Sequence, residues 1–426
     1  MMGPESVAGN LIKTVGSFFS RPQVRVETLP IGPGIPLGIE QVSNPAVGIG
    51  GAYGAWGIPY DNATLPQLLE ERMGLPLKPE EKLNLDELGF LHRHHLPPLT
   101  DEEHVQVEVS VGARLLAAAA QACGWAMSEI EAVLIGVSIP VTEDYVERIA
   151  DEAGVPDSAL KVTVHKACDS SVAALNLALN PDLPANRRLS HNLAEYLRGK
   201  KVLVGGIEGL SRVLRLARDK QAAQLFGNGA GIFGLIPGRT MKFLVGGARE
   251  AYDAEGVLQV RMTYPHSRRP NEEGSLVEVS EKGEHSVRVA GMMHEPEDIA
   301  SPVEMAGPMG MVKLFVRNGV EAVRGVYQSY RDLMARTNMV GRDIAVAIVH
   351  HANYKINQLK EKQLNKEGIK IPMPWLLSDF GNVSAASNMI AFLRQLSNLR
   401  PGDHILFDGF GAGTYYDVVA VELGSA

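Results

Sequence analysis

Short apolar runs alternate with helix-length segments along most of the 426-residue chain. Four of these runs (132–137, 202–206, 345–349 and 405–407) are bounded by Gly, Pro or charged residues, as buried strands are. The segment 111–123, which precedes the first run, has the length and composition of a helix. Strands that alternate with helices predict an α/β protein.

The second half of the chain repeats the order of segments seen in the first. Glu129 lies 39 positions before Cys168, and Asp343 lies 39 positions before Asn382. Cys168 and Asn382 each open an alanine-rich helical stretch that a further strand-like run follows. The series predicts a duplicated α/β unit with halves at 46–240 and 241–426, preceded by an N-terminal extension, 1–45.

Two polar or Gly/Pro-rich segments fall outside this repeat. The Pro and Gly content of residues 1–45 predicts an extended arm that wraps around the body. The segment 262–300 is polar and punctuated by Gly and Pro, which predicts an insertion near the site entrance or a dimer rim.

Composition narrows the function classes. The formal net charge of −8 and the lack of a Lys/Arg-rich block argue against nucleic acid as a partner. The only two cysteines, Cys123 and Cys168, predict no disulfide framework and fit a reducing cytoplasm. No apolar run reaches the roughly 18 residues that a transmembrane helix needs. We therefore expect a cytoplasmic protein without a transmembrane segment.

Three residues of the repeat could share one site. At the start of a helix, Cys168 would be favoured as a thiolate by unpaired backbone N–H groups and the helix dipole. Such a setting lowers a thiol pKa and makes the thiolate nucleophilic. His350 ends an apolar strand and Asn382 opens the matching helix. Packed face to face, the halves would form a Cys–His–Asn arrangement suited to acyl transfer. Taken singly, these residues could equally be a core cysteine, a hydrogen-bonded histidine and an N-cap.

The motifs around these residues resemble those of ketoacyl-acyl-carrier-protein synthase III over about residues 46–426. The resemblance rests on Ala167-Cys168, His350-His351-Ala352-Asn353, Phe380-Gly381-Asn382-Val383-Ser384-Ala385-Ala386-Ser387 and Gly409-Phe410-Gly411-Ala412-Gly413. A further glycine-rich loop, 226–231, is similar, with Asn228 where the family usually has Asp.

The resemblance implies a five-layered thiolase fold, a homodimer and an acyltransferase of fatty acid or polyketide biosynthesis with no separate cofactor. Cys168 would take an acyl group from a thioester. His350 and Asn382 would hydrogen-bond the donor carbonyl as it becomes an enolate on loss of CO2. The N–H of Cys168 and a glycine N–H, of Gly411 or Gly413, would form the oxyanion hole.

The resemblance also suggests partners. Lys355 falls where the family places a basic residue that docks the acidic acyl carrier protein. The family's Trp-containing segment for coenzyme A has no counterpart in 65–91, which argues against coenzyme A as the direct donor. The segment His92-Arg93-His94-His95 matches a charged surface loop of the family, so we expect no metal site there.

Two carboxylates near the nucleophile need separate interpretation. Asp169 would raise the thiol pKa unless it points away from Cys168. Glu143 lies about where related enzymes that condense without decarboxylation place a glutamate base, whereas a solvated charge at a helix start is the plainer interpretation. Non-decarboxylating condensation, simple acyl transfer from Cys168 and a catalytically idle scaffold subunit therefore stay open beside decarboxylative condensation.

Overall fold

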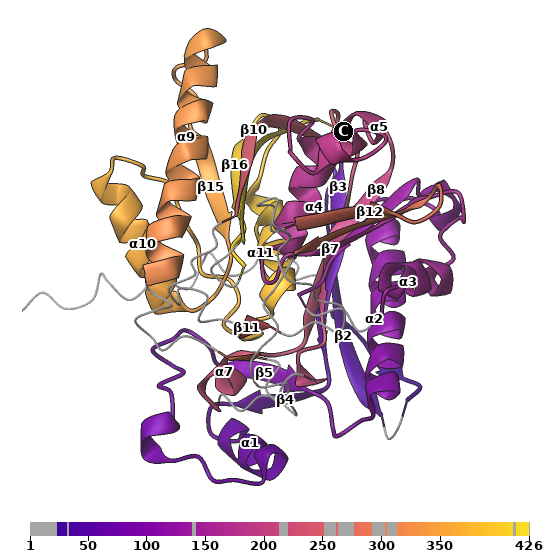
Figure 1. The fold of residues 1–426 in the computed structure, drawn as a ribbon, viewed down its shortest axis with the longest axis vertical. Helices are drawn as coiled ribbons and strands as arrows, with labels where there is room; N and C mark the ends of the chain where they lie inside the picture. The colour runs from indigo at the N-terminus through magenta and orange to yellow at the C-terminus, as the bar shows by residue number, and fades with distance from the viewer. Residues whose placement is uncertain are drawn as a thin grey trace, which may run out of the picture.

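The computed structural model describes residues 24–31, 34–138, 142–212, 220–250, 261–262, 277–291, 303–304, 313–411 and 415–425 (Figure 1). In chain order, the elements are β1 (Val24–Leu29), β2 (Ile35–Asn44), β3 (Ile49–Trp56), β4 (Ile58–Asp61), α1 (Leu65–Met73), η1 (Pro79–Glu81), β5 (His92–His95), α2 (Asp101–Ala122), η2 (Met127–Glu129), β6 (Ala132–Gly136), α3 (Tyr145–Ala153), β7 (Leu160–His165), α4 (Ser170–Leu179), η3 (Asn186–Arg188), α5 (Leu193–Tyr196), β8 (Val202–Glu208), α7 (Lys220–Leu225), β9 (Gly229–Leu235), β10 (Met241–Glu250), β11 (Arg261–Met262), β12 (Val277–Glu281), β13 (Ser286–Gly291), β14 (Val303–Glu304), η4 (Lys313–Asn318), α9 (Gly319–Arg336), β15 (Ile344–Val349), α10 (Tyr354–Lys366), η5 (Ser384–Ala386), α11 (Ser387–Gln395), η6 (Leu396–Asn398), β16 (His404–Asp408) and β17 (Tyr415–Leu423).

Two large sheets carry the fold. The first has nine strands in the order β1-β2-β3-β9-β8-β6-β7-β13-β12, and the second has four in the order β10-β17-β16-β15. The four predicted apolar runs are found as β6, β8, β15 and β16. Every residue of β6, β7 and β8 is buried, as expected for strands that helices cover on both faces.

Helices complete five layers. α2 and α3 pack on the outer face of the first sheet, α4 and α11 lie between the sheets, and α9 lies on the outer face of the second with α10 beside it (Figure 1). All ten residues of α4 are buried. Its sequence has no polar face, which is what a helix enclosed between two sheets requires. The α/β class and the five-layered arrangement are confirmed.

The described part of the N-terminal extension is not a wrapping arm. β1 and β2 form an antiparallel hairpin, and β2 pairs with β3. Ile35, Leu37 and Ile39 are buried on one face of β2, so its alternating pattern docks the hairpin on the body. The arm prediction is wrong for residues 24–44, because their apolar alternation outweighs the Pro and Gly signal. Residues 1–23 lie outside the described residues.

The predicted insertion supplies two strands to the first sheet. β13 runs parallel to β7, with Val287 opposite Val162, and β12 pairs antiparallel with β13. The N–H of Lys161 donates to His285 O at 2.8 Å at the start of this pairing. The range 241–426 thus contributes to both sheets; the remainder of 262–300 lies mostly outside the described residues.

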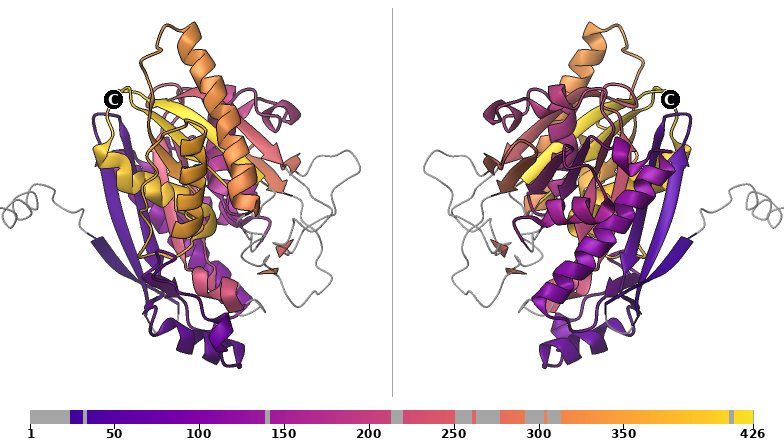
Figure 2. Two further views of the ribbon diagram at one scale, coloured as in Figure 1. Left: turned by 90° about the vertical axis from the view of Figure 1, so that its left-hand side faces the viewer. Right: turned by 90° about the vertical axis from the view of Figure 1, so that its right-hand side faces the viewer.

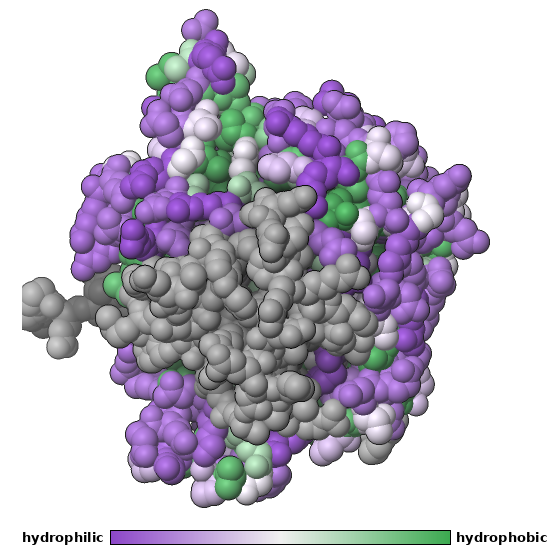
Figure 3. All heavy atoms as spheres, viewed as in Figure 1, coloured by the Kyte–Doolittle hydropathy of each residue, from purple (hydrophilic) through white to green (hydrophobic). Residues whose placement is uncertain are grey.

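The exterior is mainly polar. Purple side chains dominate the coloured rim of the face in Figure 3. α9 projects beyond the body in both views of Figure 2, and Met339 and Val340 are exposed just after its C-terminal end. Among the helices that the structure describes, none has both the length and the apolar character needed to span a bilayer.

Candidate active site

Cys168 lies in a tight turn between β7 and α4. Ala167 has a φ of +52°, in the left-handed region. The turn is held because Lys166 N donates to Ser170 Oγ at 2.7 Å and Ser170 Oγ donates to Ala167 O at 2.6 Å. α4 begins at Ser170, two residues later than predicted, so Cys168 precedes the helix rather than opening it. A non-glycine residue held at positive φ is typical of functional sites.

His350 directly follows β15. Its backbone N–H donates to Asp408 O at 3.0 Å, which ties it to the end of β16. The side chain is buried, and neither ring nitrogen has a hydrogen-bond partner among the described residues. Burial, with smaller contributions from His351 and Lys360, lowers the pKa of His350 to about 3. The imidazole is therefore neutral at pH 7 and can donate a hydrogen bond to a substrate oxygen.

Asn382 links the His350 segment to the Cys168 turn. Asn382 Nδ2 donates to Ala352 O at 3.4 Å, two residues after His350. Asn382 Oδ1 accepts from Ser384 N at 2.9 Å, and Ser384 Oγ donates to Cys168 Sγ at 3.0 Å. This chain of contacts brings Cys168, His350 and Asn382 into one neighbourhood, although the first is more than 180 positions from the others in sequence.

Ser384 is a site residue that the sequence reasoning missed. Its φ is +42°, so it is a second residue of the site in the left-handed region. The available signal was its place two residues after Asn382 in the motif 380–387. That spacing did not reveal a contact with a residue 216 positions away.

Glu208 is a second missed residue. It lies at the end of β8, is buried, and accepts hydrogen bonds from Ser138 N (2.7 Å), Ser138 Oγ (2.8 Å) and Ala385 N (3.1 Å). Burial raises the pKa of Glu208 to about 8, although these hydrogen bonds oppose the shift. Burial also raises the pKa of neighbouring Glu108, to about 7. In the sequence, Glu208 could have been recognised as the one charged residue within the apolar run 202–210.

Asp169 points away from the nucleophile, toward β17. Asp417 N donates to Asp169 Oδ1 at 3.3 Å, and Lys166 Nζ lies 3.7 Å from Asp169 Oδ2. Burial, followed by the negative charge of Asp417, raises the pKa of Asp169 well above its ordinary value. This shift favours the protonated form of Asp169 and so limits the negative charge that the residue places beside Cys168.

Glu143 forms ion pairs with two basic side chains of the β12–β13 region. Its side chain is about half exposed (48%) and pairs with Lys282 Nζ at 2.6 Å and Arg288 Nη1 at 3.5 Å. Both partners belong to the β12–β13 region, so within one chain the carboxylate faces that hairpin.

Of the two glycines predicted for the oxyanion hole, both in the β16–β17 connection, the structure describes Gly411. Gly411 N donates to Tyr415 O at 2.8 Å, which occupies the N–H that the oxyanion-hole role requires. A Cβ on Gly411 would lie 2.2 Å from Lys166 O, so this backbone packs directly on the Cys168 turn. Gly413 lies outside the described residues.

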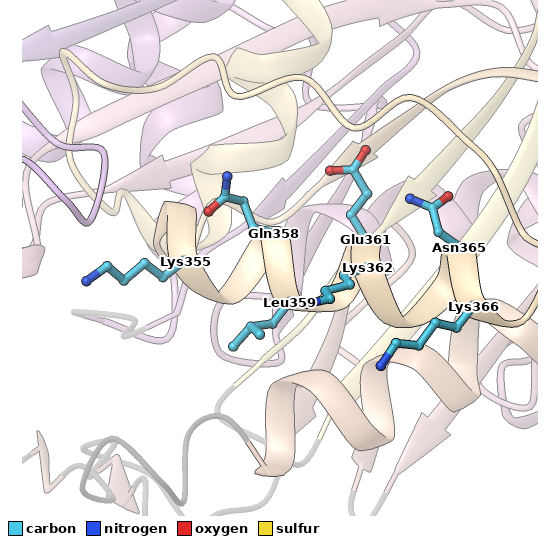
Figure 4. Close-up of a pocket in the computed structure, with 7 residues that line it drawn as sticks. All are labelled: Lys355, Gln358, Leu359, Glu361, Lys362, Asn365 and Lys366. Atoms are coloured by element: carbon cyan, nitrogen blue, oxygen red, sulfur yellow. The ribbon is translucent and has the colours of Figure 1, made fainter.

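Lys355 lies on the outer face of α10. Its ammonium pairs with Glu87 and its side chain is 52% exposed. A shallow depression of about 820 Å³ follows this face of the helix (Figure 4). It is lined by Lys355, Gln358, Leu359, Glu361, Lys362, Asn365 and Lys366.

The segment 92–95 is not a charged surface loop. It forms β5, in which Arg93 and His95 are fully buried. Arg93 packs under Gly381, where a Cβ would meet Arg93 Cγ at 2.7 Å. The surface-loop expectation is wrong because β5 supports the Asn382 loop from below. Across the described residues, no three His, Cys, Asp or Glu side chains group as metal ligands.

A family model matches the C-terminal segment that carries His350 and Asn382. The family model described as 3-oxoacyl-[acyl-carrier-protein (ACP)] synthase III C terminal matches residues 334–423, which include His350 and Asn382. The beta-ketoacyl-[acyl-carrier-protein] synthase III of Synechococcus sp. (strain RCC307) is 26% identical over 343 residues, covering 74% of this chain and 87% of that relative. The synthase III 1 of Bacillus cereus is 31% identical over 105 residues, 24% of this chain; the match spans only 33% of that relative's length.

Solved structures agree on the fold. The 3-oxoacyl-[acyl-carrier-protein] synthase III of Aquifex aeolicus superposes with a TM-score of 0.58 at 18% identity, covering 85% of this chain and 95% of that chain. This chain is similar, at low identity, to synthase III enzymes, and it shares their thiolase fold. The same thiolase fold is shared by OleA of Xanthomonas campestris, with a TM-score of 0.56, 14% identity, and coverage of 88% of this chain and 97% of that chain. Cys168, His350 and Asn382 lie in the central part of this thiolase fold.

Proposed function

We propose that this chain is an acyl-thioester condensing enzyme that forms an acyl-Cys168 intermediate and extends it by decarboxylative Claisen condensation with a malonyl thioester. The observation that carries the proposal is the contact chain that joins Cys168 to Ser384, Asn382 and the His350 segment. Homology to the synthase III enzymes supports acyl thioesters as the substrate class.

The first half-reaction uses Cys168. The Cys168 thiolate attacks the carbonyl carbon of an acyl thioester, a new C–S bond forms, and the donor thiol leaves when the original C–S bond breaks. Ser384 Oγ, at 3.0 Å from the sulfur, stabilises the thiolate before attack and again when it is released. For the oxyanion, the Cys168 N–H is the first proposed donor. Gly411 N already donates to Tyr415 O, and a role for Gly413 stays a prediction because that residue lies outside the described residues.

The second half-reaction uses His350 and Asn382. The malonyl C–C bond breaks, CO2 departs, and its electron pair forms a thioester enolate. The neutral imidazole of His350 and the amide N–H of Asn382 donate to the enolate oxygen. The enolate carbon then attacks acyl-Cys168, a C–C bond forms, and the thiolate is released. With a pKa lowered to about 3, His350 is a weak base that is poorly suited to abstracting an α-proton, whereas its neutral ring N–H can donate a hydrogen bond; this supports decarboxylation as the source of the carbanion.

An acyl carrier protein is the proposed donor carrier, with α10 as its docking face. Lys355, Lys362 and Lys366 lie along this exposed face (Figure 4) and would attract an acidic partner despite the overall charge of −8. Assembly as a homodimer and a role in fatty acid or polyketide biosynthesis belong to the same proposal. The oligomeric state can be checked by light scattering.

The alternatives are non-decarboxylating condensation, acyl transfer alone and an idle scaffold. Condensation without decarboxylation requires a base near the acyl α-carbon. Glu143, the residue predicted for that role, pairs with Lys282 and Arg288 in its own chain, so it would have to leave these ion pairs to act.

Intact-protein mass spectrometry tests the proposal. The protein is incubated with acyl-coenzyme A and acyl-carrier thioesters of several chain lengths, and then with carboxyl-labelled malonyl thioester. We expect an acyl mass increment that is lost in Cys168→Ala and retained in Cys123→Ala, followed by labelled CO2 release. Cys123 is a matched control because its thiol is buried, donates to Gly50 O and has a pKa raised to about 11 by burial. If no donor gives an adduct, the condensing-enzyme proposal is refuted and the idle scaffold subunit is favoured. If product forms without release of CO2, the decarboxylative mechanism is refuted.

A further inference from the structure

Behind the nucleophile, the two halves of the chain meet in a buried charge cluster. Lys166 Nζ pairs with Asp417 Oδ2 and lies 3.7 Å from Asp169 Oδ2; the three side chains are 5%, 0% and 0% exposed. Asn176 Nδ2 donates to Asp417 Oδ1 at 2.7 Å, which fixes the carboxylate on β17. Lys166 and Asp169 flank the Ala167-Cys168 pair in sequence, so the cluster grips both ends of the turn that presents the sulfur.

Opposite charges meet in the cluster. Burial lowers the pKa of Lys166, but Asp417 and Asp169 raise it more, so the ammonium stays charged. Burial, followed by the negative charge of Asp417, raises the pKa of Asp169 well above its ordinary value, which disfavours a second carboxylate beside the first. The Lys166 ammonium therefore offsets carboxylate charge beneath the thiolate.

The same cluster supports the β16–β17 connection. A Cβ on Gly409 would lie 1.9 Å from Asp169 Oδ1, and one on Gly411 would lie 2.9 Å from Asp169 Cβ. Gly409 N donates to Asp417 O at 2.8 Å. The backbone of Gly409 and Gly411 thus packs on Asp169 and Asp417, and its distance from Cys168 depends on where those two side chains are held.

A buried ion pair is by itself weak evidence for stability, since an apolar replacement of similar size often serves as well. Stability alone does not explain why the charges flank the nucleophile and carry the glycine connection. Two needs of the site do explain that placement: carboxylate charge beside the nucleophilic sulfur is offset by an ammonium, and the turn at positive φ is held in place.

We propose that Lys166, Asp169 and Asp417 are positioning residues that clamp the Cys168 turn against β17 and keep net negative charge away from the thiolate. The inference rests on the proposed role of Cys168 as nucleophile. Besides these three, the titratable groups that bear on the cluster are Tyr415 and Tyr416 of β17 and Glu250 of β10.

The test measures Cys168 alkylation by iodoacetamide against pH, in a Cys123→Ala background, together with the melting temperature. In Lys166→Met the two carboxyl groups lose the ammonium that offsets their negative charge, which disfavours the Cys168 thiolate. We expect the pH midpoint of alkylation to rise by roughly one to two units and the rate at pH 7 to fall about 10- to 100-fold. In the double variant Lys166→Met/Asp417→Asn one carboxylate is removed together with the ammonium, so we expect the midpoint to return to within about half a unit of the wild type.

Lys161→Met is the matched control. Lys161 is also a buried lysine, on β7, but its ammonium binds the carbonyls of Pro156 and Asp157. This substitution should lower the melting temperature and leave the alkylation midpoint unchanged. If Lys166→Met does not fold, Asp417→Asn is measured instead. This variant keeps the ammonium and loses a carboxylate, so its pH midpoint of Cys168 alkylation should equal that of the wild type or be lower.

The proposal is overturned by a folded Lys166→Met protein with a wild-type midpoint, by a double variant that shows no recovery, or by a rise in Asp417→Asn. Alkylation needs no acyl donor. If the protein shows these shifts but accepts no acyl group, the clamp proposal stands and the proposed condensing function is refuted.

Discussion

Replacing Ser384 with alanine removes the hydroxyl that donates to Cys168 Sγ at 3.0 Å. A hydrogen bond to a charged partner contributes about 1.5–3 kcal/mol. At about 1.4 kcal/mol per pH unit, its loss should raise the pH midpoint of Cys168 alkylation by about one to two units. Because Cys168 is partly exposed, water can replace part of the lost bond, and we expect the lower end of this range.

Iodoacetamide labelling of Cys168, followed by intact mass, measures this effect without an acyl donor. At pH 7 the rate should fall about tenfold in Ser384→Ala. Ser387→Ala is the matched control, since Ser387 is equally buried in the same segment and its Oγ has no hydrogen-bond partner among the described residues. Equal labelling rates in wild type and Ser384→Ala, with both proteins folded, would refute the idea that Ser384 stabilises the thiolate.

Further variants test the other assignments. His350→Ala should still form the acyl-enzyme while CO2 release from the malonyl thioester falls about 10²–10³-fold, as for loss of one oxyanion donor; an equal loss in both steps would remove His350 from the enolate site. Lys355→Glu should raise KM for a carrier-bound donor several-fold and leave the coenzyme A donor unchanged, with Lys242→Glu, on a different surface, as control. Glu143→Gln should leave the rate of condensed product formation unchanged, and a loss above tenfold would indicate the non-decarboxylating reaction. Burial lowers the pKa of His95 to about 3. The unfolded state therefore takes up its proton first, and stability falls as pH drops below about 6.5. The cost at pH 5 is about 2 kcal/mol, and urea unfolding should show a smaller pH dependence in His95→Gln.

The sequence was sufficient for elements whose pattern is local. Continuous apolar runs identified β6, β8, β15 and β16, the strands on either side of the segments that carry Cys168 and Asn382. A helix with no polar face, such as α4, indicates burial on all sides wherever it occurs.

Long-range contacts could not be predicted in this way. The Ser384–Cys168 hydrogen bond and the clamp between Lys166 and Asp417 each join residues more than 200 positions apart, and no local pattern encodes such a pairing. The polar composition of 92–95 wrongly predicted a surface loop, because Arg93 and His95 are buried beneath the loop that they support. The Pro and Gly content of the N-terminal segment wrongly predicted an extended arm over 24–44, where the chain forms a regular hairpin.

The β12–β13 hairpin has a consequence for assembly. An unpaired strand edge is a template on which another chain can add. β13 covers the edge of β7 from within the same chain, so in the described structure the first sheet ends at β12 on one side and at β1 on the other. A second copy that extended this sheet would therefore meet β12 or β1, and β7, the strand that leads to Cys168, would stay in the sheet interior of each subunit.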